Sequence, residues 1–124
     1  MLSPAISLIV LRTANLEACL TFYRRLGLEL VAEKHERGPV HYSCALGSLV
    51  LEIYPGSVGI APEPKVGGAT MIGFCVSSLH DTLTALQDLS VKVLSSPTTS
   101  AWGLRAVVLD PDGRAIELVE QGSE

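Results

Sequence analysis

The sequence is poor in aromatic residues, in basic charge and in paired cysteines. Aromatic side chains make up only 5% of its 124 residues, so Leu, Val, Ile and Ala must supply most of the core. Lys and Arg total 9 against 13 Asp and Glu, a formal net charge of −4, which excludes a basic stripe for nucleic acid. The three cysteines form no Cys-x-x-Cys pair, which predicts reduced thiols in a cytoplasmic protein rather than a disulfide framework.

Long apolar runs and nucleotide-binding loops are missing as well. The apolar run over 5–11 is too short to span a bilayer and follows no basic region, so we expect a strand there, with no membrane association. Neither a Gly-rich phosphate loop nor a Ser-His-Asp arrangement is visible. The hydrophobic content of 48% is nevertheless ample for burial, which predicts a compact domain over 1–124.

The two halves of the chain repeat one order of elements, strand–helix–strand–strand–strand. Leu16 and Leu79 open the two helical patterns 63 positions apart, and Ser78 with Asp81 resembles a capping box. We therefore predict an α+β fold of two βαβββ modules, 1–54 and 69–120, joined by a Pro- and Gly-rich linker over 55–68.

The expected strands follow from β-branched and apolar runs between turn signals. They are 4–12, 28–34, 40–46, 48–54, 69–76, 91–94, 102–109 and 114–120. The Ser- and Thr-rich stretch 95–100 is expected to be a polar loop, and Asp110-Pro111-Asp112-Gly113 is a strong turn signal.

Two glutamates, Glu52 and Glu117, stand in otherwise apolar strands at matching places in the two modules. An ionised carboxylate is costly to bury unless it is paired, hydrogen-bonded or bound to metal, so the pair predicts a shared site. Strand alternation predicts that further side chains share their face. These are Leu8, Val10, Arg12, Val50, Tyr54, Met71, Gly73, Cys75, Ala115 and Val119.

Two motifs in fixed order resemble a known family. The first is Phe22-Tyr23-Arg24-Arg25-Leu26-Gly27-Leu28, and the second is Asp-Pro-Asp-Gly-Arg-Ala-Ile-Glu-Leu over 110–118, with Leu-Glu-Ile over 51–53 between them. Together they resemble the vicinal oxygen chelate superfamily, which includes glyoxalase I, extradiol dioxygenases and bleomycin-resistance proteins. The resemblance implies curved sheets that line a cleft, helices on the outer faces, and a homodimer.

The resemblance also implies four metal-ligand positions, which fall here on Leu8, Glu52, Met71 and Glu117. Leucine has no ligating atom, and the methionine thioether is too soft for the metals that oxygen ligands hold. We therefore expect no cofactor and no tightly bound metal, although the two carboxylates could hold a divalent ion weakly. Among the histidines only His41 is a candidate substitute ligand, since His35 and His80 are expected on the surface.

The remaining candidates each have two readings. Glu52 and Glu117, the catalytic candidates, form either a binding or acid–base pair, or inherited charges neutralised by Arg12, Arg105 or water. Arg12 anchors an anionic ligand group or pairs with a glutamate. Trp102 stacks on a ligand or packs in the core or a dimer interface.

Three functions remain open from these residues. The first is a metal-independent protein that binds a small organic molecule, with ligand contacts from Arg12, Glu52, Tyr54, Met71, Trp102 and Glu117. The second is a metal-dependent lyase, isomerase or dioxygenase of the same superfamily that uses Glu52 and Glu117. The third is an interaction module whose cleft is filled by its own side chains.

Overall fold

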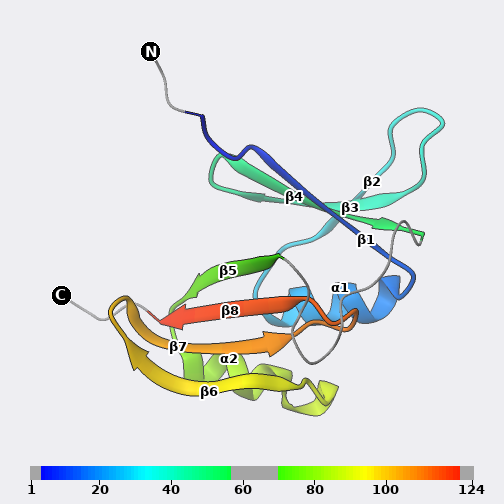
Figure 1. The fold of residues 1–124 in the computed structure, drawn as a ribbon. Helices are drawn as coiled ribbons and strands as arrows, with labels where there is room; N and C mark the ends of the chain where they lie inside the picture. The colour runs from blue at the N-terminus through cyan, green and yellow to red at the C-terminus, as the bar shows by residue number, and fades with distance from the viewer. Residues whose placement is uncertain (1–3, 57–69, 121–124) are drawn as a thin grey trace. The chain divides into compact units, whose positions relative to one another are not determined.

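The computed structural model describes residues 4–56 and 70–120, which form two compact units divided between 59 and 60 (Figure 1). Each unit has the order βαβββ and one four-stranded mixed sheet. The predicted α+β class with two tandem modules is confirmed. The predicted linker, 55–68, lies outside the described residues from 57 onward.

Unit 1 has the sheet order β1-β4-β3-β2. Its elements are β1 (Leu8–Thr13), α1 (Leu16–Arg25), β2 (Val31–Glu33), β3 (His41–Leu46) and β4 (Leu49–Pro55). The edge strand β1 runs parallel to β4, and the hairpin of β3 and β4 turns at Gly47 with a φ of 64°. Helix α1 packs against β4, whose alternate residues Leu51 and Ile53 are fully buried.

Unit 2 repeats this plan with the sheet order β5-β8-β7-β6. Its elements are β5 (Met71–Val76), α2 (Leu79–Leu86), the short 3-10 helix η1 (Gln87–Leu89), β6 (Val93–Ser100), β7 (Gly103–Leu109) and β8 (Ala115–Glu120). Helix α2 packs against β7 and β8, where Val108, Ile116 and Leu118 are fully buried.

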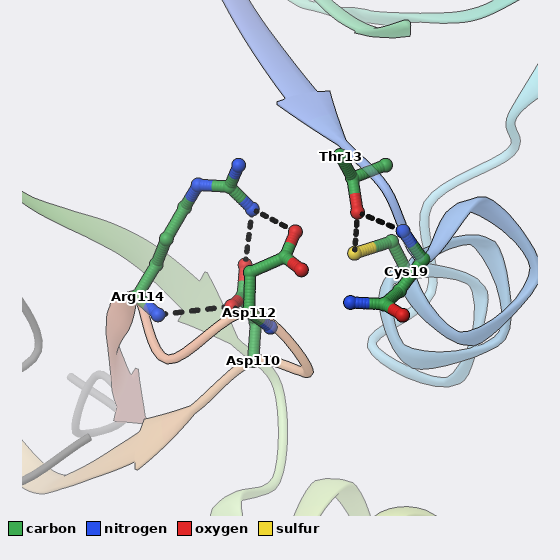
Figure 2. A network of polar contacts seen from close by, with 6 residues as sticks. Thr13, Cys19, Asp110, Asp112 and Arg114 are labelled. Atoms are coloured by element: carbon green, nitrogen blue, oxygen red, sulfur yellow. Dashed lines mark hydrogen bonds and ion pairs between the residues drawn. The ribbon is translucent and has the colours of Figure 1, made fainter. Parts of the chain in front are cut away.

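Local hydrogen bonds fix the entry to each helix. At α1 the Thr13 hydroxyl accepts from the Asn15 backbone N–H at 2.8 Å and from the Cys19 thiol at 3.4 Å (Figure 2). At α2 the Ser78 hydroxyl accepts from the Asp81 N–H, which confirms the predicted cap. The Glu120 carboxylate accepts from the Leu79 N–H at 2.7 Å, so the last strand also caps α2.

The turn over 110–113 is held by the buried carboxylate of Asp110 (Figure 2). Its Oδ1 accepts from the backbone N–H groups of Asp112 and Arg114, both at 2.9 Å. The Arg114 guanidinium reaches Oδ2 of Asp110 at 2.9 Å and Asp112 at 3.1 Å. Asp110 therefore organises the whole β7–β8 connection.

The prediction of a polar loop over 95–100 is wrong, because these residues belong to strand β6. Strand β6 is the edge of its sheet, and most of its residues are exposed, so Ser and Thr need no apolar partner there. Pro97 falls between Ser95 and Thr98, where the register with β7 shifts, so its missing N–H breaks no regular ladder bond.

Several boundaries also differ from prediction. Strand β1 begins at Leu8 rather than 4, β2 covers only Val31–Glu33 of the expected 28–34, and β7 begins at Gly103. Trp102 therefore lies in the β6–β7 turn and not in a strand. Within the described residues, no helix combines the length and apolar character required to cross a membrane.

Candidate functional site

The predicted site residues lie on one face of each sheet, which is called the open face here because the helix of the unit packs against the opposite face. In unit 1 the parallel register pairs Leu8 with Val50, Val10 with Glu52, and Arg12 with Tyr54, so these six side chains share a face. In unit 2 Met71, Gly73 and Cys75 stand beside Ala115, Glu117 and Val119. Strand alternation thus predicted both faces, while the placement of the two faces around one cleft stays a prediction.

Exposed apolar groups mark both open faces. Leu8 is 52% exposed in unit 1 and Met71 is 51% exposed in unit 2. Val31, at the β2 edge of the unit 1 sheet, is exposed as well. Such side chains are typical of a surface that a ligand or a partner covers.

Glu52 lies against His41 in the interior of the unit 1 face. Register places Ser43 opposite Glu52 on β3, so His41 is its diagonal neighbour. His41 Nε2 lies 3.4 Å from Glu52 Oε2, and the two side chains are only 2% and 16% exposed. The His41 imidazole therefore lies beside the Glu52 carboxylate. That His41 faces a cleft stays a prediction.

Three further groups surround His41. Its ring stacks on Tyr54 with centroids 4.3 Å apart and an interplanar angle of 6°. Its Nδ1 lies 3.3 Å from the carbonyl oxygen of Pro39, and its Nε2 lies 3.1 Å from Glu33 Oε1. Glu33 was missed by sequence reasoning, because only the β2–β3 register shows that it faces His41.

Arg12 continues this row of side chains along β1. Its guanidinium carbon lies 5.9 Å from the centroid of the Tyr54 ring, within cation–π range. Arg12, Tyr54 and His41 thus form a cationic and aromatic strip beside Glu52. Of these three residues Arg12 is exposed, so the strip offers a guanidinium to an organic ligand with an anionic or acceptor group.

Glu117 in unit 2 is paired with Arg105 from β7. Both Nε and Nη2 of Arg105 donate to Glu117 Oε2, at 3.0 and 2.8 Å. Arg105 is the diagonal neighbour of Glu117, since Val107 is directly opposite. Gly73 leaves room for this arrangement, because a Cβ there would lie 3.2 Å from Glu117 Oε1.

The four family-implied ligand positions do not fit a metal ion. Leu8 offers only alkyl carbon and Met71 only a thioether. Oε2 of Glu117 already accepts two charge-assisted hydrogen bonds, and Glu52 lies against an imidazole. Both carboxylates therefore have a compensating partner inside their own unit.

Trp102 is 77% exposed at the tip of the β6–β7 hairpin. Core packing is therefore excluded, and contact with a ligand or a second protomer stays open. Cys19 and Cys44 are buried as expected of small apolar groups, whereas Cys75 lies on the exposed face.

Replacing Trp102 with alanine should change the free energy of unfolding by no more than about 0.5 kcal/mol, because the side chain is exposed. Urea unfolding followed by circular dichroism measures this change. The control is Phe22→Ala, which removes a fully buried ring and should cost about 3–5 kcal/mol. A loss above about 1.5 kcal/mol for the Trp102 variant would show that the ring packs against structure.

A groove of about 520 Å³ lies elsewhere in unit 2, alongside α2. Leu83 and Leu86 of α2 face Val93 and Leu104 across it. Val108, which lies on the opposite side of β7 from Val107, also lines it, so the groove belongs to the helix side of the sheet. It is separate from the face that carries Glu117.

Solved structures with the same fold cover almost the whole chain. An antibiotic-binding protein from a Streptomyces species has 20% identity and a TM-score of 0.68, with 98% of this chain and 99% of that chain covered. A glyoxalase-related enzyme from Fulvimarina pelagi has 21% identity and a TM-score of 0.71, with 94% and 88% covered. At such identities the likeness shows the fold alone.

A third similar structure, a glyoxalase/bleomycin resistance protein/dioxygenase family enzyme from Burkholderia phytofirmans, has 14% identity and a TM-score of 0.66, with 94% and 98% covered. Among the curated proteins none matches this chain. The family model for the Glyoxalase/Bleomycin resistance protein/Dioxygenase superfamily matches residues 5–118. The chain therefore belongs to the glyoxalase/bleomycin resistance protein/dioxygenase superfamily.

Proposed function

We propose that this protein binds a small organic molecule on the open faces of its sheets, without a metal ion at Glu52 and Glu117. The observation that carries the proposal is that each carboxylate already has a partner, His41 or Arg105, within its own unit. Exposed apolar groups such as Leu8 and Met71 stand where the metal-dependent relatives are expected to have ligands. A similar fold serves an antibiotic-binding protein, which supports this class of function.

The unit 1 face indicates what such a ligand should look like. Tyr54 and His41 stack, and the Arg12 guanidinium lies over the same Tyr54 ring. The exposed Arg12 guanidinium in this strip suits an anionic or carbonyl group of the ligand. Met71 and Trp102 are the corresponding apolar contacts that we expect from unit 2. We also expect a cytoplasmic homodimer that does not bind nucleic acid.

The experiment is a thermal-shift and Trp102 fluorescence screen of aromatic and glycopeptide antibiotics against protein kept in a chelator. A bound ligand should raise the melting temperature, since it binds only the folded state. Arg12→Ala and Glu52→Gln should each weaken binding about tenfold, the effect of one lost polar contact worth about 1.4 kcal/mol. Glu17→Gln, an exposed change on α1, should leave affinity unchanged.

Leu83→Trp is the matched control for position, because it narrows the groove beside α2 and leaves both open faces intact. If this variant abolishes binding while Arg12→Ala does not, the ligand occupies the groove and the proposal is wrong. Ligand affinity that disappears in chelator would contradict metal-independent binding.

The competing function is a divalent-metal-dependent lyase, isomerase or dioxygenase that uses Glu52 and Glu117. It requires Glu117 to exchange two hydrogen bonds from Arg105 for a metal ion. A filled-cleft interaction module is less well supported. It would require side chains such as Trp102 and Tyr54 to fill the cleft, and Trp102 is exposed.

A further inference from the structure

A cluster of two histidines and a glutamate lies at the β2–β3 side of the unit 1 sheet. Glu33 is the last residue of β2, His41 is the first residue of β3, and His35 follows Glu33 in the connecting turn. Each offers one ligand atom, and these atoms all lie within 4.8 Å of one another. The cluster draws on none of the four family-implied ligand positions.

We propose that Glu33, His35 and His41 form a binding site for a divalent transition metal ion of the zinc type. Zinc is commonly bound by imidazole nitrogens together with carboxylate oxygens, whereas magnesium and calcium prefer oxygen ligands alone. The proposal does not depend on the proposed organic ligand, since either can stand if the other fails.

The spacing of the ligand atoms suits tetrahedral coordination. Metal–ligand bonds of about 2.0–2.1 Å give a distance of about 3.3 Å between neighbouring ligands. Glu33 Oε1 lies 3.1 Å from His41 Nε2 and 3.4 Å from His35 Nε2. The ligand atoms of the two histidines lie within 4.8 Å of each other, so a movement of the exposed His35 side chain would complete the site.

The surroundings of His41 resemble the outer coordination of a metal-bound histidine. The Pro39 carbonyl can only accept, so Nδ1 of His41, at 3.3 Å, is the donor in that contact. Nε2, the other ring nitrogen, lies 3.1 Å from Glu33 Oε1. A histidine held by a backbone carbonyl in this way is oriented for ligation.

The sheet fixes the positions of Glu33 and His41, whereas the third ligand, His35, can move. Glu33 and His41 are paired directly across the β2–β3 ladder, and His41 is stacked on Tyr54. His35 is 70% exposed by side chain and lies on the turn, with the positive φ of Glu36 helping the chain to reverse. A metal ion here would fasten the short edge strand β2 and keep a coordination position open to water.

The test is a Zn²⁺ titration of the untagged protein in competition with a chromophoric chelator. We expect one Zn²⁺ per chain, and Co²⁺ should give the intense visible absorption of a low-coordinate N/O site. His35→Ala should raise the Zn²⁺ Kd at least tenfold, because even residues outside the coordination shell change metal affinity 10- to 100-fold. This variant should fold, since His35 is exposed.

His80→Ala is the matched control, because His80 is the remaining histidine and lies exposed on α2. It should leave the Kd and the Co²⁺ spectrum unchanged. The proposal is overturned if the wild type shows no saturable 1:1 binding, or if His35→Ala binds as tightly as the wild type. It is also overturned if Glu117→Gln, rather than His35→Ala, removes the binding.

Discussion

Replacing Asp110 with alanine is expected to destabilise the protein by about 3 kcal/mol. The side chain is fully buried and accepts two backbone hydrogen bonds and one from Arg114. Hydrogen bonds to a charged group contribute about 1.5–3 kcal/mol each, and their loss leaves donors unsatisfied in the turn. Urea unfolding should show a lower midpoint at unchanged slope.

The companion change is Asp112→Ala, which removes only a carboxylate contact with Arg114 among the bonds described above. It should cost about 1 kcal/mol, because the two backbone bonds of Asp110 remain. Equal losses for the two variants would mean that the charge of the turn, and not the Asp110 backbone contacts, stabilises it.

Replacing His41 with alanine is the second large expected effect, also about 3 kcal/mol. The change opens a cavity under Tyr54 and removes the contact with Pro39. It also leaves the carboxylate of Glu52, which is only 16% exposed, without its imidazole neighbour. Thermal and urea unfolding in a chelator isolate this effect from metal binding.

His80→Ala provides the control for the loss of an imidazole. Because His80 is exposed, this change should lower the free energy of unfolding by no more than about 0.5 kcal/mol. Glu52→Gln tests the same His41–Glu52 contact by changing the carboxylate. It should lower the free energy of unfolding by about 1 kcal/mol, because the charge-assisted contact is lost. A stable His41→Ala protein would show that Glu52 is satisfied by solvent alone.

Features governed by neighbours in sequence could be predicted well. Gly47 marks the β3–β4 hairpin, Ser78 caps α2, and the carboxylate of Asp110 holds its turn as turn chemistry requires. Strand alternation likewise placed Glu52 with Tyr54, and Glu117 with Cys75, because side chains alternate with period two.

Features governed by pairing between strands could not be predicted. The expected partner of Glu117 was Arg12, Arg105 or water, and only the β7–β8 register shows that Arg105 is its diagonal neighbour. Glu33 was not among the expected site residues, yet the β2–β3 register pairs it with His41. The strand expected over 91–94 continues to Ser100 in β6, and this extension was missed because an exposed edge strand can have the composition of a loop.

The account depends on Glu117 being held by Arg105 rather than available to a metal ion. Its most direct test compares Ni²⁺-induced melting shifts of the His35→Ala protein with and without Glu117→Gln. We predict no shift that depends on Glu117, because both hydrogen bonds from Arg105 persist in the presence of Ni²⁺. A stoichiometric rise in melting temperature that Glu117→Gln abolishes would contradict the account.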